Sequence, residues 1–324
     1  MRALLFFVAI ATFAVGACAL PPPYAYVGKW GTNGTGNGQF RTPIDVAGAP
    51  SNYVYVVDSG NNRIQYFNTS GSYLGKWGSS GSGNGQFNNP RGVAVASNYN
   101  VYIADQNNNR IQYFSATGSY LGKWGTYGTG NGQFRATNAV SVAANGNVYV
   151  VDYDNYRVQY FTSTGSYLGK WGSEGSGNGQ FDHPLGVAIA PNGNVYVSEN
   201  DNHRVQYFTS TGSYLGKWGS YGTGDGQFHS ANRVAITPNG VVLVADYFNN
   251  RIQYFNLTGS FLGKFGSAGT GNGQFNNPVG IGINPGGVLV YICDSNNDRV
   301  QYFRDEEQVG VNPVSLGRVR ALFR

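Results

Sequence analysis

The three histidines of the chain, His183, His203 and His229, are its first candidates for metal or proton-transfer chemistry. A catalytic zinc site commonly uses three protein ligands around an open coordination position. His183 lies two residues after a Gly-Gln-Phe motif and His229 one residue after the next such motif, whereas His203 lies in a different segment. Histidines at unmatched positions are not expected to converge on one ion. The sequence therefore predicts no metal site, no catalytic residue and no cofactor.

Acidic residues recur five positions before an arginine, and each pair is separated by four loop residues. The acid ends one expected strand and the arginine begins the next, so antiparallel pairing would place the two side chains opposite each other in a charge-assisted contact. A ring of acids serving a metal or catalysis is the alternative, but a partner arginine in every copy favours structural ion pairs. The expected pairs are Asp58–Arg63, Asp105–Arg110, Asp152–Arg157, Glu199–Arg204, Asp246–Arg251 and Asp294–Arg299.

These pairs belong to an internal repeat with a period of 47 residues. The Gly-Gln-Phe motif recurs six times, with its phenylalanine at positions 40, 87, 134, 181, 228 and 275. Each unit contains four short runs typical of β-strands, separated by Asn, Gly and Ser; in the second unit they are 92–96, 101–104, 110–114 and 120–124. Four strands per repeat of this length predict an all-β fold, a six-bladed β-propeller of four-stranded antiparallel blades.

The two ends of the repeat region indicate how the ring closes. The sixth unit ends at Phe303 without its own Tyr-Leu-Gly-Lys-Trp run, and a matching run, Tyr26 to Trp30, stands near the N-terminus. We therefore expect the N-terminal strand to complete the last blade, which removes exposed sheet edges.

The units resemble NHL repeats over 26–303, in the motifs at 83–90, 101–105 and 109–114. The resemblance implies the propeller fold but is weak evidence for function, because one fold hosts many activities. Related propellers include the zinc enzyme peptidylglycine amidating lyase, whose histidine set has no evident counterpart here. Lactonase-type propellers would require acids around a central metal. At the first-strand position expected to line the channel entry, the charged residues of the six units are only Asp45 and Arg233, and an aspartate facing an arginine is a poor cage for a cation.

Recognition is expected where the copies diverge, on the face that carries the loops between the second and third strands. Aromatic residues are concentrated there in the third and fifth units and their crossovers, and Glu174, His183 and Glu199 lie in the fourth unit between them. A polar-aromatic patch that binds a glycan or peptide is one interpretation, and drift on a solvated surface is the other. The expected binding residues are Tyr127, Tyr153, Tyr156, His203, Tyr221, Tyr247 and Phe248.

Taken together, these features predict a secreted, non-catalytic scaffold for an extracellular protein or glycan, with a metal-dependent lyase or lactonase-like enzyme as the alternative. The net charge of +5 is spread evenly and no zinc-binding module is present, so we expect no nucleic-acid partner. No apolar run outside the N-terminal segment is long enough to span a membrane.

The terminal segments and sequons add expectations of location. Residues 1–19 resemble a secretory signal peptide, and in a bacterial host a lipid attached to Cys18 would instead anchor the protein to the membrane. The propeller is expected over 20–303. The tail, 304–324, does not repeat; it is expected either to fray or to pair with a second copy in a homo-oligomer. The sequons at Asn33, Asn68 and Asn256 predict N-glycosylation in a eukaryotic host, or are chance occurrences.

Overall fold

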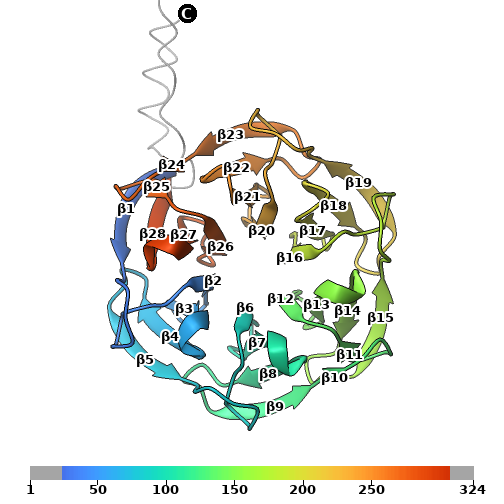
Figure 1. The fold of residues 1–324 in the computed structure, drawn as a ribbon, viewed down its shortest axis with the longest axis horizontal. Coiled ribbons are helices and arrows are strands. Elements are labelled where there is room, and N and C mark those ends of the chain that lie inside the picture. The colour runs from blue at the N-terminus through green and yellow to red at the C-terminus, as the bar shows by residue number, and fades with distance from the viewer. Residues whose placement is uncertain (1–23, 307–324) are drawn as a thin grey trace, which may run out of the picture.

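The computed structural model describes residues 24–306, which form a closed ring of six four-stranded antiparallel sheets (Figure 1). The predicted fold class is therefore confirmed. The expected signal peptide and almost all of the expected tail lie outside the described residues. No helix among the described residues has the length and apolarity needed to cross a membrane.

Each blade runs outward from the axis in chain order. Blade 1 contains β2 (Pro43–Gly48), β3 (Tyr53–Asp58), β4 (Arg63–Asn68) and β5 (Tyr73–Trp77), and blade 2 contains β6 (Pro90–Val95), β7 (Val101–Asp105), β8 (Arg110–Phe114) and β9 (Tyr120–Trp124). Blade 3 contains β12 (Thr137–Val142), β13 (Val148–Asp152), β14 (Arg157–Phe161) and β15 (Tyr167–Trp171), and blade 4 contains β16 (Pro184–Ile189), β17 (Val195–Glu199), β18 (Arg204–Phe208) and β19 (Tyr214–Trp218). Blade 5 contains β20 (Ala231–Ile236), β21 (Val242–Asp246), β22 (Arg251–Phe255) and β23 (Phe261–Phe265).

Blade 6 joins the two ends of the described chain. Its inner strands are β26 (Pro278–Ile283), β27 (Leu289–Asp294) and β28 (Arg299–Asp305), and β1 (Tyr24–Trp30) pairs antiparallel with β28 on the outside. The expected closure by the N-terminal strand is thus confirmed. Tyr24 pairs with Asp305, so β28 runs two residues beyond the expected end of the propeller.

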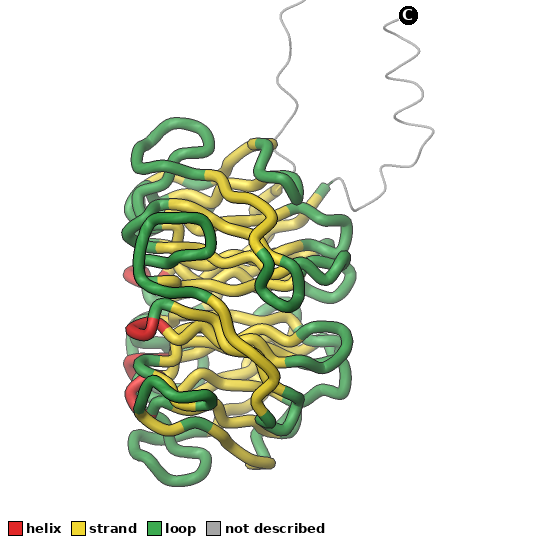
Figure 2. Tube along the Cα trace, turned by 90° about the vertical axis from the view of Figure 1, so that its right-hand side faces the viewer, coloured by secondary structure: helices red, strands yellow, loops and turns green. Residues whose placement is uncertain are grey.

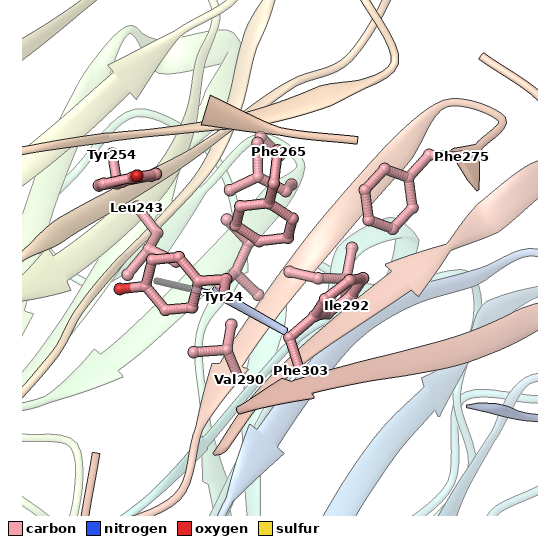
Figure 3. Close-up of a cluster of buried hydrophobic side chains, with 11 residues drawn as sticks. Tyr24, Leu243, Tyr254, Phe265, Phe275, Val290, Ile292 and Phe303 are labelled. Carbon is pink, nitrogen blue, oxygen red and sulfur yellow. The ribbon is translucent and has the colours of Figure 1, made fainter. Parts of the chain in front are cut away.

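The core lies between neighbouring blades and is largely aromatic. Figure 3 shows the cluster between blades 5 and 6, where the ring of Phe265 lies 4.8 Å from that of Phe303 and 5.1 Å from that of Tyr24. Aromatic pairs at such separations contribute attraction beyond the area they bury. The first strand of the chain is therefore fastened to the last two blades by side-chain packing as well as by backbone pairing.

Short connections build one face of the disc. Three-residue 3-10 turns follow the second strand of four blades, η1 (Ser59–Asn61), η2 (Gln106–Asn108), η3 (Tyr153–Asn155) and η4 (Ser295–Asn297), and Figure 2 shows them all on one face. The crossovers between blades reach the same face, where two of them contain small parallel pairs, β10 (Thr126–Tyr127) with β11 (Gln133–Phe134) and β24 (Ser267–Ala268) with β25 (Gln274–Phe275). We call this face the loop face.

Candidate active site at the loop face

A buried ion pair in every blade holds the loop face in place. In blade 2, Asp105 and Arg110 are directly paired across β7 and β8, and Arg110 Nε lies 2.7 Å from Asp105 Oδ2. The Arg110 guanidinium also donates to the backbone carbonyls of Ser82, Gly83 and Gln86 in the incoming crossover. These contacts fix the crossover to the turn, which is a structural role. The same contact, at 2.6–2.7 Å, joins Asp58–Arg63, Asp152–Arg157, Glu199–Arg204, Asp246–Arg251 and Asp294–Arg299.

His183 is the centre of a charged cluster at the start of blade 4. Its Nδ1 lies 2.6 Å from Asp201 Oδ2 and 2.9 Å from Asp182 Oδ1. The rings of Tyr153 and Tyr156, from the neighbouring blade, lie 4.8 and 5.2 Å from its imidazole. The imidazole therefore sits between two carboxylates and two aromatic rings and keeps about 29% of its side-chain surface exposed.

A second cluster lies one blade further on and contains His203, His229, Tyr221 and Phe248. The His229 ring lies 4.6 Å from Phe248 and 5.1 Å from Tyr221, and the His203 ring lies 5.0 Å from Tyr221. His203 Nδ1 accepts a hydrogen bond from the backbone N–H of Ser230. Burial, followed by the neighbouring His229, lowers the pKa of His203. Neutral imidazole is therefore favoured at this position.

Hydrogen bonds connect the two clusters. The Asn200 side-chain amide donates to Asp201 Oδ1, and its carbonyl oxygen accepts from the Ser230 hydroxyl. Because the Ser230 backbone also donates to His203, an uninterrupted path runs from His183 to His203. The His183 and His203 clusters are thus linked through Asp201, Asn200 and Ser230 at the loop face of blades 4 and 5.

Tyr153 and Tyr247 share a cation near the axis, Arg91 at the start of β6. Burial raises the pKa of both phenols, and the Arg91 charge acts in the opposite direction on each. Burial, and then the nearby Arg233, lowers the pKa of Arg91. Tyr247 also packs against the apolar cluster of blade 1 and blade 2. The Arg91 charge therefore acts on two tyrosines from different blades, while its Nε donates to Gln106 Oε1 at 3.2 Å.

Tyr127 does not join these groups. Its ring is 67% exposed and carries Arg135 above it at 5.5 Å from the centroid. Together with Asp154 and Tyr156 it lines a shallow pocket of about 560 Å³ between blades 2 and 3. Of the expected binding residues, Tyr153 and Tyr156 contact His183, and Tyr247 feels the charge of Arg91. His203, Tyr221 and Phe248 lie in the second cluster.

Sequence reasoning missed Arg91, Asp182 and Asp201 and gave His183 no chemical role. A comparison of equivalent positions in the six copies could have found them. The two positions after the Gly-Gln-Phe motif combine an acid and a histidine only in blade 4, and Arg91 is the only cation at its repeat position. The second position after the paired acid is an aspartate only in blades 3 and 4, Asp154 and Asp201.

The charged cluster can perform proton transfer. An imidazole whose Nδ1–H donates to a carboxylate presents Nε2 as a proton acceptor. A guanidinium nearby can hold negative charge that develops on a substrate oxygen. Among the described residues, Asp182, His183 and Asp201 are also the one group of three or more such side chains with ligand atoms close enough, within 4.8 Å of one another, to hold a metal ion. Nitrogen and oxygen donors of this kind suit a divalent cation with open positions.

Comparisons with known proteins agree with the fold and change the expectation of function. The NHL repeat family model matches residues 87–114 and 181–208. No curated protein matches the sequence. A gluconolactonase from Xanthomonas campestris superimposes with a TM-score of 0.63 at 13% identity, covering 88% of this chain and 99% of that one. A streptogramin B lyase gives 0.58 at 12% identity, covering 85% and 96%, and a virginiamycin B lyase from Staphylococcus aureus gives 0.56 at 12% identity, covering 81% and 94%.

The expectation of a non-catalytic scaffold is therefore wrong, because these structural neighbours are named enzymes and support the alternative of a lactonase- or lyase-like propeller. The reason for the error is physical. Near-identical blades were taken to leave no room for chemistry, but residues that differ between copies bring Asp182, His183 and Asp201 together on the loop face. At these identities the likeness itself establishes the fold alone.

Proposed function

The chain is an NHL-repeat six-bladed β-propeller, and on that basis we propose that it is an enzyme of the lactonase or lyase type, with its active site at the mouth of the loop face. The observation that carries the proposal is His183, whose partly exposed imidazole is held at Nδ1 by Asp201 and Asp182. The substrate class is a small polar cyclic ester, which both kinds of reaction can open.

One base suffices for either reaction. In hydrolysis, His183 Nε2 takes a proton from water, the hydroxide adds to the ester carbon, the ring C–O bond breaks, and the imidazolium returns the proton to the leaving oxygen. In elimination, Nε2 takes a proton from the carbon next to the ring carbon that carries the ester oxygen, and a C=C bond forms between these two carbons. The alkyl C–O bond breaks, the ester leaves as a carboxylate, and the imidazolium passes its proton to solvent. Arg91 would bind the carbonyl oxygen as it becomes negative. Tyr153, which contacts His183 and lies near Arg91, would position the substrate between them.

Asp182, His183 and Asp201 would hold a divalent cation if the enzyme uses one. Such an ion, when bound, supplies Lewis acidity to an ester oxygen. In that case Asp201 and Asp182 act as ligands, and Arg91 and Tyr153 keep their roles in binding and orienting the ester.

The test is turnover of a panel of sugar and aliphatic lactones, with and without added Zn²⁺, Ca²⁺ or Mg²⁺. Mass spectrometry separates the reactions, because hydrolysis adds one water and elimination leaves the mass unchanged. H183Q is expected to lower kcat/KM at least ~100-fold, the usual contribution of a positioned base. N296A, at the blade 6 position that matches Asp201, is the control and should leave kcat/KM unchanged. Turnover by H183Q within twofold of wild type, or none by wild type on the whole panel, contradicts the proposal.

Location and modification remain proposals. Secretion directed by residues 1–19 would bring the enzyme to extracellular substrates, with lipid anchoring through Cys18 as the bacterial alternative. Asn68 ends β4 and Asn256 follows β22, and each side-chain oxygen accepts a hydrogen bond from the hydroxyl of its own sequon's Ser or Thr. Asn33 is exposed in a crossover and donates to Asp298. Glycosylation at Asn68 and Asn256 would leave the loop-face residues untouched.

A further inference from the structure

The shallow pocket of about 560 Å³ between blades 2 and 3 contains none of the groups assigned to the proposed reaction. It is lined by side chains from the turn after β7, from the crossover into blade 3 and from the turn after β13. Its volume lies within the range of about 300–1,000 Å³ that is typical of small-molecule sites. The pocket is therefore large enough to receive a small organic molecule.

One positive and one negative side chain line this pocket, Arg135 and Asp154, and both residues are exposed. The Asp154 backbone N–H donates to the Arg135 carbonyl at 3.1 Å, which holds the two backbones side by side. Within residues 24–306, neither the guanidinium nor the carboxylate takes part in an ion pair or a hydrogen bond. A guanidinium only donates hydrogen bonds and a carboxylate only accepts them, whereas a hydroxyl group does both. The offsetting charges therefore favour a neutral ligand that carries hydroxyl groups.

Tyr127 gives the pocket an aromatic wall. Its ring is 67% exposed, and the Arg135 guanidinium lies 5.5 Å from the ring centroid, in a contact that orders both side chains. An exposed tyrosine offers a large amphipathic contact area at a low cost in conformational entropy. The amides of Gln106 and Asn107 add further donors and acceptors to the lining. An aromatic wall beside such groups matches a sugar ring, whose faces carry C–H groups and whose edge carries hydroxyls.

Two contacts join this pocket to the proposed active site. Tyr156 lines the pocket, and its ring lies 5.2 Å from the imidazole ring of His183. Gln106 also lines the pocket, and its Oε1 accepts a hydrogen bond from Arg91 Nε at 3.2 Å. His183 is the proposed base, and Arg91 is the proposed partner of the ester carbonyl. A ligand in the pocket would therefore be separated from the reacting ester by a single layer of side chains.

We propose that this pocket is a subsite for a neutral sugar unit, so that the substrate is a sugar lactone joined by a glycosidic bond to a second sugar. The inference rests on the proposed function, because the lactone ring is the part that His183 opens. The second sugar takes no part in bond breaking. It packs on Tyr127, and its hydroxyl groups donate to Asp154 and accept from Arg135. Binding energy from such a non-reacting part of a substrate can raise kcat/KM.

Binding to the pocket is tested without turnover. The methyl glycosides of glucose, galactose, mannose and xylose are titrated into the protein while the backbone ¹H–¹⁵N signals around Tyr127 are followed by NMR, with glucuronate and glucosamine as charged counterparts. At least one neutral glycoside should give a saturable shift, and both charged sugars should bind more weakly. Y127A should weaken binding at least ~5-fold, whereas Y127F keeps the ring and should restore it. Y99A removes an exposed tyrosine from the turn between β6 and β7, outside the pocket, and is the matched control.

Turnover tests whether the sugar unit belongs to the substrate. The δ-lactones of maltobionic, cellobionic and lactobionic acid are compared with glucono-δ-lactone, which lacks the second sugar. At least one of the three should have a kcat/KM at least ~10-fold above that of glucono-δ-lactone. Y127A should reduce this ratio at least ~5-fold, and Y99A should leave it unchanged.

Several results would overturn the subsite. These are the absence of a saturable shift with every neutral glycoside, tighter binding of glucuronate, and an equal loss of binding in Y99A. Sugar binding with equal kcat/KM for the one-sugar and two-sugar lactones would mean that the pocket does not serve the substrate. If the wild type binds a glycoside but opens no lactone, the proposed function fails while the sugar site stands. The wild-type titrations and kinetics decide these questions even if Y127A fails to fold.

Discussion

Replacement of Asp45 by asparagine tests the electrostatics of the propeller axis. Burial raises the pKa of the Asp45 carboxyl from 3.8 to about 6, against the opposing effects of Arg233 and of the backbone N–H groups of Val93 and Val46. The carboxyl thus binds its proton more tightly in the folded chain than in the unfolded chain. The amide side chain of the D45N variant cannot titrate but can still accept hydrogen bonds through its oxygen.

The sign and size of the effect follow from this pKa. Below about pH 4 the carboxyl is protonated in both states, and above pH 6 it is ionised in both. Between these limits the folded chain binds more protons than the unfolded chain, so the free energy of unfolding must fall as the pH rises. A pKa of about 6 instead of 3.8 corresponds to a fall of roughly 3 kcal/mol across this window.

The assay is urea unfolding of wild type and D45N at intervals from pH 3.5 to 7.5. The difference between the two free energies of unfolding isolates Asp45 from the other carboxyls, including Asp152, whose pKa is also raised by burial. D45N should gain roughly 3 kcal/mol relative to wild type between pH 4 and pH 6, whatever its stability at pH 4. Curves that stay parallel across this range would refute the assignment of a strongly raised pKa to Asp45.

Two further predictions concern repeated contacts. D105N leaves the Arg110 guanidinium buried without its carboxylate and should lower the free energy of unfolding by about 3–5 kcal/mol. D225N removes only the exposed pair with Lys264 and is the control, which should cost less than about 1 kcal/mol. Equal losses would contradict a structural role for the buried pair. W77F should cost less than about 1 kcal/mol in the same urea assay, because the indole N–H of Trp77 is buried without a partner and its removal offsets lost contacts. Phe265 already occupies this position in blade 5, and a loss above about 3 kcal/mol would contradict the prediction.

The fold could be predicted from the sequence because its determinants are local and repeated. The acid and arginine of each hairpin are five residues apart, so their pairing follows from strand geometry alone. The sixth unit lacks an outer strand, and the run at Tyr26–Trp30 has the sequence of that strand, so the N-terminal run can be assigned to the sixth blade. The small parallel pairs β10–β11 and β24–β25 were not foreseen, since two-residue pairings leave no periodic signal.

The candidate site could be predicted only in part. Divergence between copies identified Tyr153 and Tyr247. The charge that acts on both of them, Arg91, comes from a third blade, and no spacing along the chain indicates that interaction. Repeat alignment places Asp45 and Arg233 at the same position of the first strand in their two blades. Their separation of 3.8 Å depends on a long side chain crossing the axis from blade 5 to blade 1, which repeat alignment does not describe.

The pairing of β1 with β28 has a consequence for biosynthesis. The N-terminal strand leaves the ribosome long before its hydrogen-bonding partner, which is made only after about 270 further residues. Until then, one side of an incomplete disc remains open, with apolar side chains of the unfinished blade exposed to solvent and to other nascent chains. Contacts between such distant segments form slowly, so circularisation should be the late, committing event of folding. Once made, the same junction should oppose fraying at either end of the ring, because neither blade 1 nor blade 6 can peel away alone.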